Sequence, residues 1–125
     1  MIDRLTNLRW LKTADVTGKQ VTWSDAFTAI EILNEEAEGT GWRLSNINEL
    51  ESVVDCSMHS PALPATHPFR EVKEAYWSST TSIFEPDWAW VLYLHNGAVG
   101  VGQKKGAHFC VWAVGDAPDA DINKT

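Results

Sequence analysis

The chain has 125 residues, of which 44% are hydrophobic and 22% charged, a composition typical of one soluble globular domain. Its net charge of −7 argues against nucleic acid and anionic membranes as partners, because a phosphate-binding surface needs a basic field. No apolar run is long enough to span a bilayer, so we expect no membrane insertion. Seven tryptophans favour an aromatic core, or a few rings left outside as a contact surface.

The N-terminal half predicts a short strand followed by a helix. Residues 7–11 alternate in part and indicate the strand, and Gly18 marks a turn. Thr22 is a suitable N-cap, and Asp25 lies in the first turn of the predicted helix, where the helix dipole favours an acid. As far as Gly39, apolar residues then recur at helical spacing and form one stripe that should face the core: Trp23, Ala26, Phe27, Ile30, Leu33 and Ala37.

A second, shorter helix follows a brief extended segment. Residues 42–44 are read as extended, and Asn46 with Glu49 makes a capping pattern. Residues 56–74 then form a long connection with three prolines, which we expect to lie over the surface and to be pinned by Leu63 and Phe69. The predicted second helix places four apolar residues on one face: Ile47, Leu50, Val53 and Val54.

The C-terminal half predicts antiparallel strands. Residues 75–81 and 88–95 are rich in strand-forming residues, and Asn96-Gly97 predicts a type I′ hairpin turn, after which Val99 and Val101 continue the return strand. Residues 109–114 supply a last strand. Two helices followed by an antiparallel meander indicate the α+β class.

Four sequence motifs occur in an order that resembles the Lcl C-terminal-like domain family. They are Thr22–Ala26 (TWSDA), Trp42–Asp55 (WRLSNINELESVVD), Tyr76–Thr81 (YWSSTT) and Trp90–Gly97 (WVLYLHNG). The resemblance runs from about Asp3 to Gly115. It predicts one domain over residues 1–115, with residues 116–125 as a polar, acidic tail or linker.

The resemblance implies a C-type-lectin-like fold, in which two helices pack on a twisted antiparallel sheet with long loops. Family members occur in bacterial collagen-like adhesins, other surface proteins and phage proteins, bind ligands at surfaces, and assemble as trimers where they cap a stalk. The family often has cysteines where this chain has Ile30 and Ala113. Ser45 replaces the usual proline, and Trp112 replaces the usual arginine.

The cysteines, histidines and Arg43 each allow more than one interpretation. Cys56 and Cys110 are expected to be free thiols, with a new bridge as the alternative. Cys56-x-x-His59, His67 and His108-x-Cys110 have zinc-like spacing, but the pairs lie far apart and no metal is expected. Arg43 is either a ligand-binding residue or, as we favour, the partner of a nearby carboxylate, Glu49 or Glu51.

Neither catalysis nor calcium-dependent sugar binding is the favoured interpretation of the C-terminal half. Glu85-Pro86-Asp87 is similar to the Glu-Pro-Asn loop of C-type lectins, but no second carboxylate cluster follows it. The hydroxyls of residues 78–81 lack a nucleophile motif and are read as partners of the backbone. We therefore expect no catalytic residue and no cofactor.

The expected function is ligand recognition, or alternatively a structural cap formed by three copies. The ligand would be a protein or a carbohydrate, and the domain would lie on a bacterial surface or a phage fibre, with a cytoplasmic location as the alternative. If the strand face of Val91 and Tyr93 points away from the core, Trp88, Tyr93 and Trp112 form either an exposed patch or a second core beneath the loops. Trp88 and Trp112 are also the candidate interface residues. The candidate ligand-binding residues lie in or near the loops 82–88 and 102–108: Phe84, Glu85, Asp87, Trp88, Tyr93, Lys104, Lys105 and His108.

Overall fold

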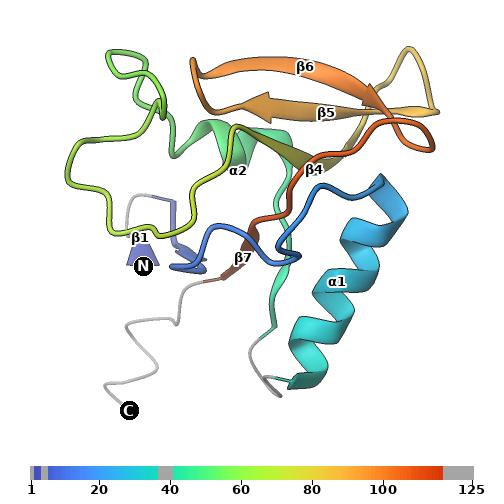
Figure 1. The fold of residues 1–125 in the computed structure, drawn as a ribbon, viewed down its shortest axis with the longest axis horizontal. Helices are drawn as coiled ribbons and strands as arrows, with labels where there is room; N and C mark the ends of the chain where they lie inside the picture. Colours follow the sequence, from blue (N-terminus) through green and yellow to red (C-terminus); the bar gives the residue numbers. More distant parts are fainter. Residues whose placement is uncertain (1, 4–5, 37–40, 117–125) are drawn as a thin grey trace.

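A computed structural model describes residues 2–3, 6–36 and 41–116. These residues form an α+β fold, so the predicted class is confirmed, but the strands belong to two antiparallel sheets instead of one. One sheet has the order β1-β2-β7-β3 and the other the order β4-β5-β6 (Figure 1). The elements are β1 (Ile2–Asp3), β2 (Leu8–Trp10), α1 (Trp23–Glu36), β3 (Arg43–Leu44), α2 (Ile47–Glu51), β4 (Ala75–Thr81), β5 (Trp88–Tyr93), β6 (Ala98–Gln103) and β7 (Ala113–Asp116).

The four-stranded sheet joins both ends of the described chain. Strand β2 pairs with β1 on one side and β7 on the other, so that Leu8 is aligned with both Asp3 and Asp116. The predicted last strand is displaced toward the C-terminus. Phe109 and Cys110 form only single bridges, to Val21 and Tyr76, because this segment passes from one sheet to the other. The predicted tail lies, apart from Asp116, outside the described residues.

Helix α1 begins one residue after the predicted cap and carries the predicted apolar stripe. Ala26 and Ile30 are buried, while Trp23, Phe27 and Leu33 are partly buried against the same cluster. The Asn34 side chain joins the end of the helix to β3, since its amide donates to the Trp42 carbonyl (2.7 Å) and its oxygen accepts from the Trp42 N–H (2.8 Å). The predicted helix end at Gly39, together with Ala37, lies outside the described residues.

Helix α2 begins with the predicted capping pair. The Asn46 side chain accepts from the Glu49 N–H at 2.8 Å, and the Glu49 carboxylate accepts from the Asn46 N–H at 2.9 Å. Leu50 is fully buried. Residues 56–74 cross the surface as predicted. The side chains of Leu63 and Phe69, which are 1% and 8% exposed, enter the core and anchor this segment.

The β5–β6 hairpin is confirmed, but the type I′ turn is wrong. The connection comprises the four residues 94–97, because β5 ends at Tyr93 and β6 begins at Ala98. Leu94, the first of them, is fully buried. Only Gly97 has a positive φ (+79°), and its N–H donates to the Tyr93 carbonyl at 2.8 Å. The Asn96 side chain instead accepts from the Ala98 N–H.

Two hydrophobic clusters share the interior, and adjacent strand residues alternate between them. The first cluster contains Tyr76, Leu92 and Trp112, and the second contains Trp77, Val91 and Ala113. The expectation that Val91 points away from the core is wrong, because both faces of β5 are covered there. Ile30 and Ala113, which stand where the resembling family often has cysteines, are buried in the second cluster.

Ser45 is buried between β3 and the capped end of α2, and its hydroxyl finds no hydrogen-bond partner among the described residues.

Among residues 2–3, 6–36 and 41–116, no helix is long and apolar enough to cross a bilayer.

Candidate functional site

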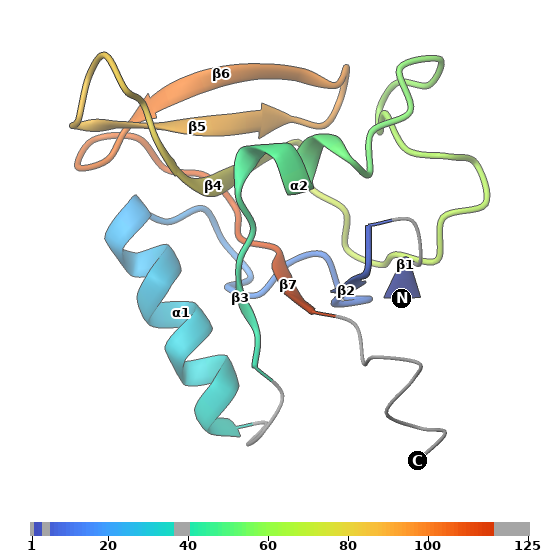
Figure 2. The same ribbon diagram turned by 180° about the vertical axis from the view of Figure 1, so that it is seen from behind.

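Two loops of the C-terminal half meet the start of α1 at one end of the molecule. The Lys104 N–H donates to the Asp87 carbonyl at 2.8 Å, which joins loop 82–87 to loop 104–108. The Trp23 N–H approaches the Lys104 carbonyl at 3.4 Å, which joins the second loop to α1. We call this region the loop end. The views in Figures 1 and 2 place it on the opposite side of the molecule from β1 and β2.

The tip of loop 82–87 is the most exposed apolar point among the described residues. Ile83 and Phe84 are 84% and 82% exposed. Ser82 beneath them is buried, and its hydroxyl lies 3.4 Å from the N–H groups of both Phe84 and Glu85. The Trp88 N–H donates to the Glu85 carbonyl at 2.9 Å and closes the turn. The loop therefore holds two apolar side chains in water on a hydrogen-bonded base.

A shallow hollow of about 360 Å³ lies beside this tip. Four residues line it: Ser82, Glu85, Trp88 and Val101. Trp88 is half-buried, and Val101 is 39% exposed on the neighbouring strand β6. The hollow thus combines an aromatic ring, an aliphatic side chain and one carboxylate. Such a surface can contact an apolar part of a ligand, while the carboxylate accepts hydrogen bonds that fix the orientation of the ligand.

Lys104 is held in place by neighbouring side chains. Its ammonium donates to the Thr81 hydroxyl at 2.9 Å and lies 4.0 Å from the centroid of the Trp23 ring. The Trp23 indole N–H in turn donates to the Ser78 carbonyl at 2.9 Å. Lys104 therefore serves to position the loop, whereas Lys105 is exposed beside it.

The other candidate ligand residues are distributed unevenly. Glu85 and Asp87 are exposed at the loop end. Tyr93 is not brought there, because it lies at the opposite end of β5 from Trp88, on the other face, with its ring centroid 6.0 Å from that of Phe109. His108 is exposed in the second loop.

Trp112 cannot belong to a surface patch or a subunit interface, so that expectation is wrong. It is fully buried, with ring centroids of Trp10, Phe69 and Tyr76 between 4.6 and 5.4 Å away. Its indole N–H donates to the Leu11 carbonyl at 2.9 Å. Alternation along the chain sends Val111 and Ala113 to the cluster beside α1 and Trp112 to the opposite cluster. Trp88, Tyr93 and Trp112 do not form a shared second core beneath the loops either, because Tyr93 packs against the cluster beside α1 and Trp88 lines the hollow.

Arg43 forms the predicted ion pair. Two guanidinium nitrogens lie 2.7 and 2.6 Å from the two carboxylate oxygens of Glu49, while Glu51 takes no part. Burial acts to raise the pKa of Glu49, but the hydrogen bonds from Arg43 and the Asn46 N–H, with the charge of Arg43, hold it below its ordinary value. The Arg43 side chain is 41% exposed and also approaches Asp116 at 3.4 Å. The pair is therefore half-buried and joins β3 to α2.

The thiols and imidazoles do not converge. Cys56 is exposed and Cys110 is buried, and both are free; burial raises the pKa of the Cys110 thiol. Within the described part of the chain, no three His, Cys, Asp or Glu side chains are placed to hold a metal ion.

The hydroxyls of β4 serve the backbone and neighbouring side chains, as the sequence predicted in part. Ser78 donates to the Trp90 carbonyl at 2.6 Å, and Thr80 accepts from the Ile47 N–H at 3.0 Å. Thr81 accepts from Lys104. These bonds fix β4 against β5 and α2.

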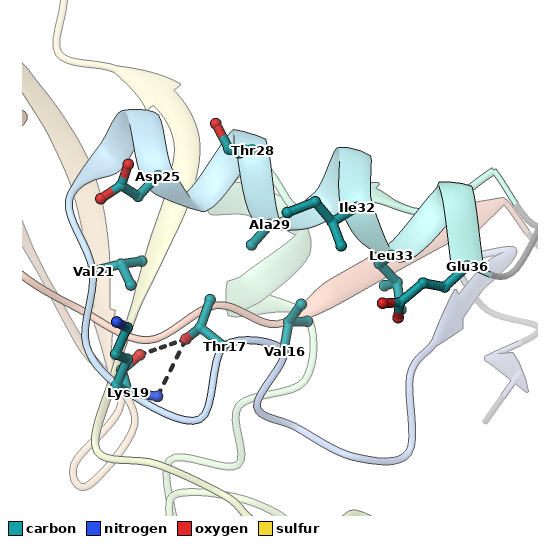
Figure 3. A pocket seen from close by; sticks show the side chains of 10 residues that line it. All are labelled: Val16, Thr17, Lys19, Val21, Asp25, Thr28, Ala29, Ile32, Leu33 and Glu36. Atoms are coloured by element: carbon teal, nitrogen blue, oxygen red, sulfur yellow. Dashed lines mark hydrogen bonds between the residues drawn. The ribbon is translucent and has the colours of Figure 1, made fainter.

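A larger groove of about 410 Å³ runs along α1 (Figure 3). Ala29, Ile32 and Leu33 point from the helix toward the segment that contains Val16, and Asp25 and Glu36 stand at the two ends. Eleven residues of helix separate these acids by about 16 Å. They lie too far apart to act as a catalytic pair, and the groove between them is lined by both apolar and polar side chains.

Sequence reasoning did not select Ile83, Val101 or Trp23 as site residues. Ile83 and Phe84 form an apolar pair between Ser82 and Glu85 in a turn-rich segment, and that pairing was a usable signal. The approach of Val101 and Trp23 to the loops depends on strand register and on the position of α1, which the sequence does not display.

A comparison with curated proteins yields no match. The model of the Lcl C-terminal domain family matches residues 1–115, which is nearly the whole chain. The match covers all the helices and strands described above except the last residue of β7. The chain therefore belongs to the Lcl C-terminal domain family.

Proposed function

We propose that this domain is a non-catalytic recognition module that contacts a protein or carbohydrate ligand through its loop end. The observation that carries the proposal is the exposure of Ile83 and Phe84 on an ordered turn beside the Trp88 hollow. Apolar side chains of this size contribute nothing to folding when they stay in water, and each can contribute about 1.5–3 kcal/mol once a partner buries it. Phe84 and Trp88 are the apolar anchors, and Glu85 and Asp87 orient the ligand.

The arrangement of the chain supports display of the loop end toward a partner. Strands β1 and β7 flank β2 in the four-stranded sheet, on the side of the molecule away from the loop end (Figure 1). A larger protein joined at this side would leave loop 82–87 pointing outward. We further propose that the fold is of C-type-lectin-like architecture and that the domain acts on a bacterial surface or a phage fibre.

A trimeric cap held together by Trp88 and Trp112 has less support, because Trp112 lies in the core. Catalysis also has less support, because the β4 hydroxyls already serve structural bonds and the carboxylates of the α1 groove lie far apart. Ligand recognition accounts for the exposure of Ile83 and Phe84, which neither alternative explains.

The proposal is tested by screening the 125-residue protein against a glycan array and a panel of cell-surface protein ectodomains. Phe84→Ser should weaken any binding that is found by about tenfold or more, because it removes an anchor worth over 1.4 kcal/mol. Ile32→Ser is the matched control, since Ile32 is 48% exposed on α1, outside the loop end. Binding that tolerates Phe84→Ser but fails with Ile32→Ser would move the site to the α1 groove.

A further inference from the structure

Strand β6 forms a free edge of the three-stranded sheet. The other edge, β4, is already occupied: Trp77 N–H donates to the Cys110 carbonyl at 3.1 Å, and Ser79 N–H donates to the Ser45 carbonyl at 2.8 Å. Strand β6 pairs with β5 on one side. On its other side, both views show it at the rim of the molecule, with no other strand or helix beyond it (Figures 1 and 2).

Hydrogen-bond directions along β5 identify the backbone groups that β6 presents at this rim. The Trp88 carbonyl accepts from Ser82 N–H at 2.8 Å and Leu94 N–H donates to the Glu74 carbonyl at 2.6 Å, so alternate residues from Trp88 to Leu94 turn their backbone toward β4. The intervening residues turn theirs toward β6, where their partners in register are Ala98, Gly100 and Gly102. It follows that Val99 and Val101 direct their N–H and C=O groups outward, and no bond from another described segment reaches them.

The chemistry of β6 does not protect this edge. Monomeric proteins block an edge strand with lysine, proline or a bulge. The sequence of β6 is Ala-Val-Gly-Val-Gly-Gln, without charge or proline, and it pairs with β5 without a register shift. Val99 and Val101 are also 41% and 39% exposed. The edge therefore combines unpaired backbone donors and acceptors with uncovered apolar side chains.

We propose that a second copy of this chain covers the edge, with the two β6 strands antiparallel across a two-fold axis. An axis beside Gly100 sets Val99 of each copy opposite Val101 of the other and matches donors with acceptors. A neutral, apolar edge is complementary to a strand of the same character, and β6 itself has that character, whereas a charged peptide would find no counter-charge on it. The result is one six-stranded sheet.

The fold also limits this assembly to two copies. Because β4 is covered, each three-stranded sheet offers one free edge among the described residues, so pairing consumes both edges and closes. Strands β1 and β7, in which the described residues begin and end, lie below α2 and β4 in Figure 1, whereas β6 lies above them. Phe84 is not part of the β6 edge, but Val101 belongs both to this edge and to the hollow beside Phe84. The dimer is therefore measured without ligand, and Phe84→Ser tests ligand binding alone, so that either proposal can fail without the other.

Light scattering and amide hydrogen exchange on the unaltered 125-residue protein test the proposal together. We expect the mass to double as concentration rises, and the exchange of the Val99 and Val101 amides to slow with the same midpoint. The Gly100 and Gly102 amides, which bond to β5, are the internal control and should exchange slowly throughout. A monomer up to about 1 mM, the range of very weak association, overturns the proposal. So does a trimer, or a dimer whose Val99 and Val101 amides still exchange rapidly.

A pair of variants at one position separates strand pairing from other contacts. Val101→Lys places a charge at the edge without disturbing a buried side chain, and should raise the dimer dissociation constant by about tenfold or more. Val101→Thr keeps a β-branched, uncharged strand former and should leave the constant within about threefold. Phe84→Ser should leave the dimer unchanged. Equal dissociation constants for the Lys and Thr variants, or loss of the dimer in Phe84→Ser, contradict pairing through β6.

Discussion

The Arg43–Glu49 pair gives one glutamate side chain two structural tasks. Its carboxylate caps α2 by accepting the Asn46 N–H, and it also binds the Arg43 guanidinium through both oxygens. The side chain of Glu49 is 13% exposed, while that of Arg43 is 41% exposed. Because water screens the arginine, the charge contributes less than its geometry suggests. The hydrogen bond from the Asn46 N–H to the Glu49 carboxylate makes a second contribution to stability, and water screens it less because Glu49 is mostly buried.

Glu49→Gln should destabilise the domain by about 1 kcal/mol at neutral pH, because the amide keeps an acceptor for the cap but loses the charge. The pKa of Glu49 is lowered in the folded protein. Its contribution is therefore fully present above the ordinary glutamate pKa and is lost as pH falls through the lowered one. Urea unfolding of both proteins from pH 7 to pH 3 should show the difference shrink in that acidic window. Glu51→Gln, an exposed carboxylate on the same helix, is the control and should show no such convergence.

At the scale of elements, the β5–β6 turn shows what a glycine is required for. Gly97 has a φ of +79°, and a Cβ built there would lie 2.8 Å from Val54 Cγ1. Gly18 has a similar φ of +72°, with nothing within 4 Å of its Cβ position. Both positions therefore favour glycine because of their positive φ, but only at Gly97 would a Cβ also clash with a neighbouring side chain.

Gly97→Ala should cost about 2–3 kcal/mol, from a positive φ and a clash together, and Gly18→Ala about 1 kcal/mol, from the φ alone. Thermal or urea unfolding of both variants measures the difference. Equal destabilisation would show that Val54 moves aside freely, and that the turn does not pack against the segment after α2.

Many elements could be predicted from local signals, because caps and periodicity are recorded in neighbouring residues. Thr22 and Asn46 placed the starts of both helices correctly, and the stripe through Ile30 faces the core as predicted. The second helix is shorter than predicted, because α2 ends at Glu51 and Val53 and Val54 follow it. The division into two sheets was not predictable, since it depends on where residues 109–112 cross between them. Trp112 illustrates the same limit. Alternation correctly predicted that Trp112 and Ala113 point to opposite sides, but it did not indicate that the side of Trp112 is also buried.

The candidate site was predictable at the level of loops and not of side chains. Phe84, Glu85, Asp87 and Trp88 do gather at the loop end, because adjacent strands bring their connecting loops together. Lys104 is held by Thr81 and Trp23, so its charge is not simply available to a ligand. No spacing rule in the sequence reports that a ring 81 residues earlier would lie beneath its ammonium.

At the scale of the whole molecule, Tyr76 ties together segments that are distant in the sequence. Its hydroxyl donates to the Ala14 carbonyl at 2.5 Å and accepts from the Lys73 N–H at 2.7 Å. Burial is the main reason that the pKa of Tyr76 lies far above its ordinary value, so the hydroxyl keeps its proton. The hydroxyl can therefore still donate to the Ala14 carbonyl at pH values at which an ordinary tyrosine would ionise.

Tyr76→Phe should destabilise the domain by about 1–3 kcal/mol, because it leaves a buried carbonyl and a backbone N–H without this partner. Amide exchange at Lys73 should also become faster. Tyr93→Phe is the matched control: its hydroxyl has no hydrogen-bond partner among the described residues, and we expect a change below about 0.5 kcal/mol. An unchanged Lys73 amide in Tyr76→Phe would show that the tie does not hold this segment.

The consecutive rings of Tyr76 and Trp77 have a consequence for how the molecule comes apart. Since one strand sends neighbouring side chains into both clusters, neither cluster can open without withdrawing a ring from the other. Melting followed by tryptophan emission and by far-ultraviolet circular dichroism should therefore coincide in a single transition, and a partly opened form with one intact half should not accumulate.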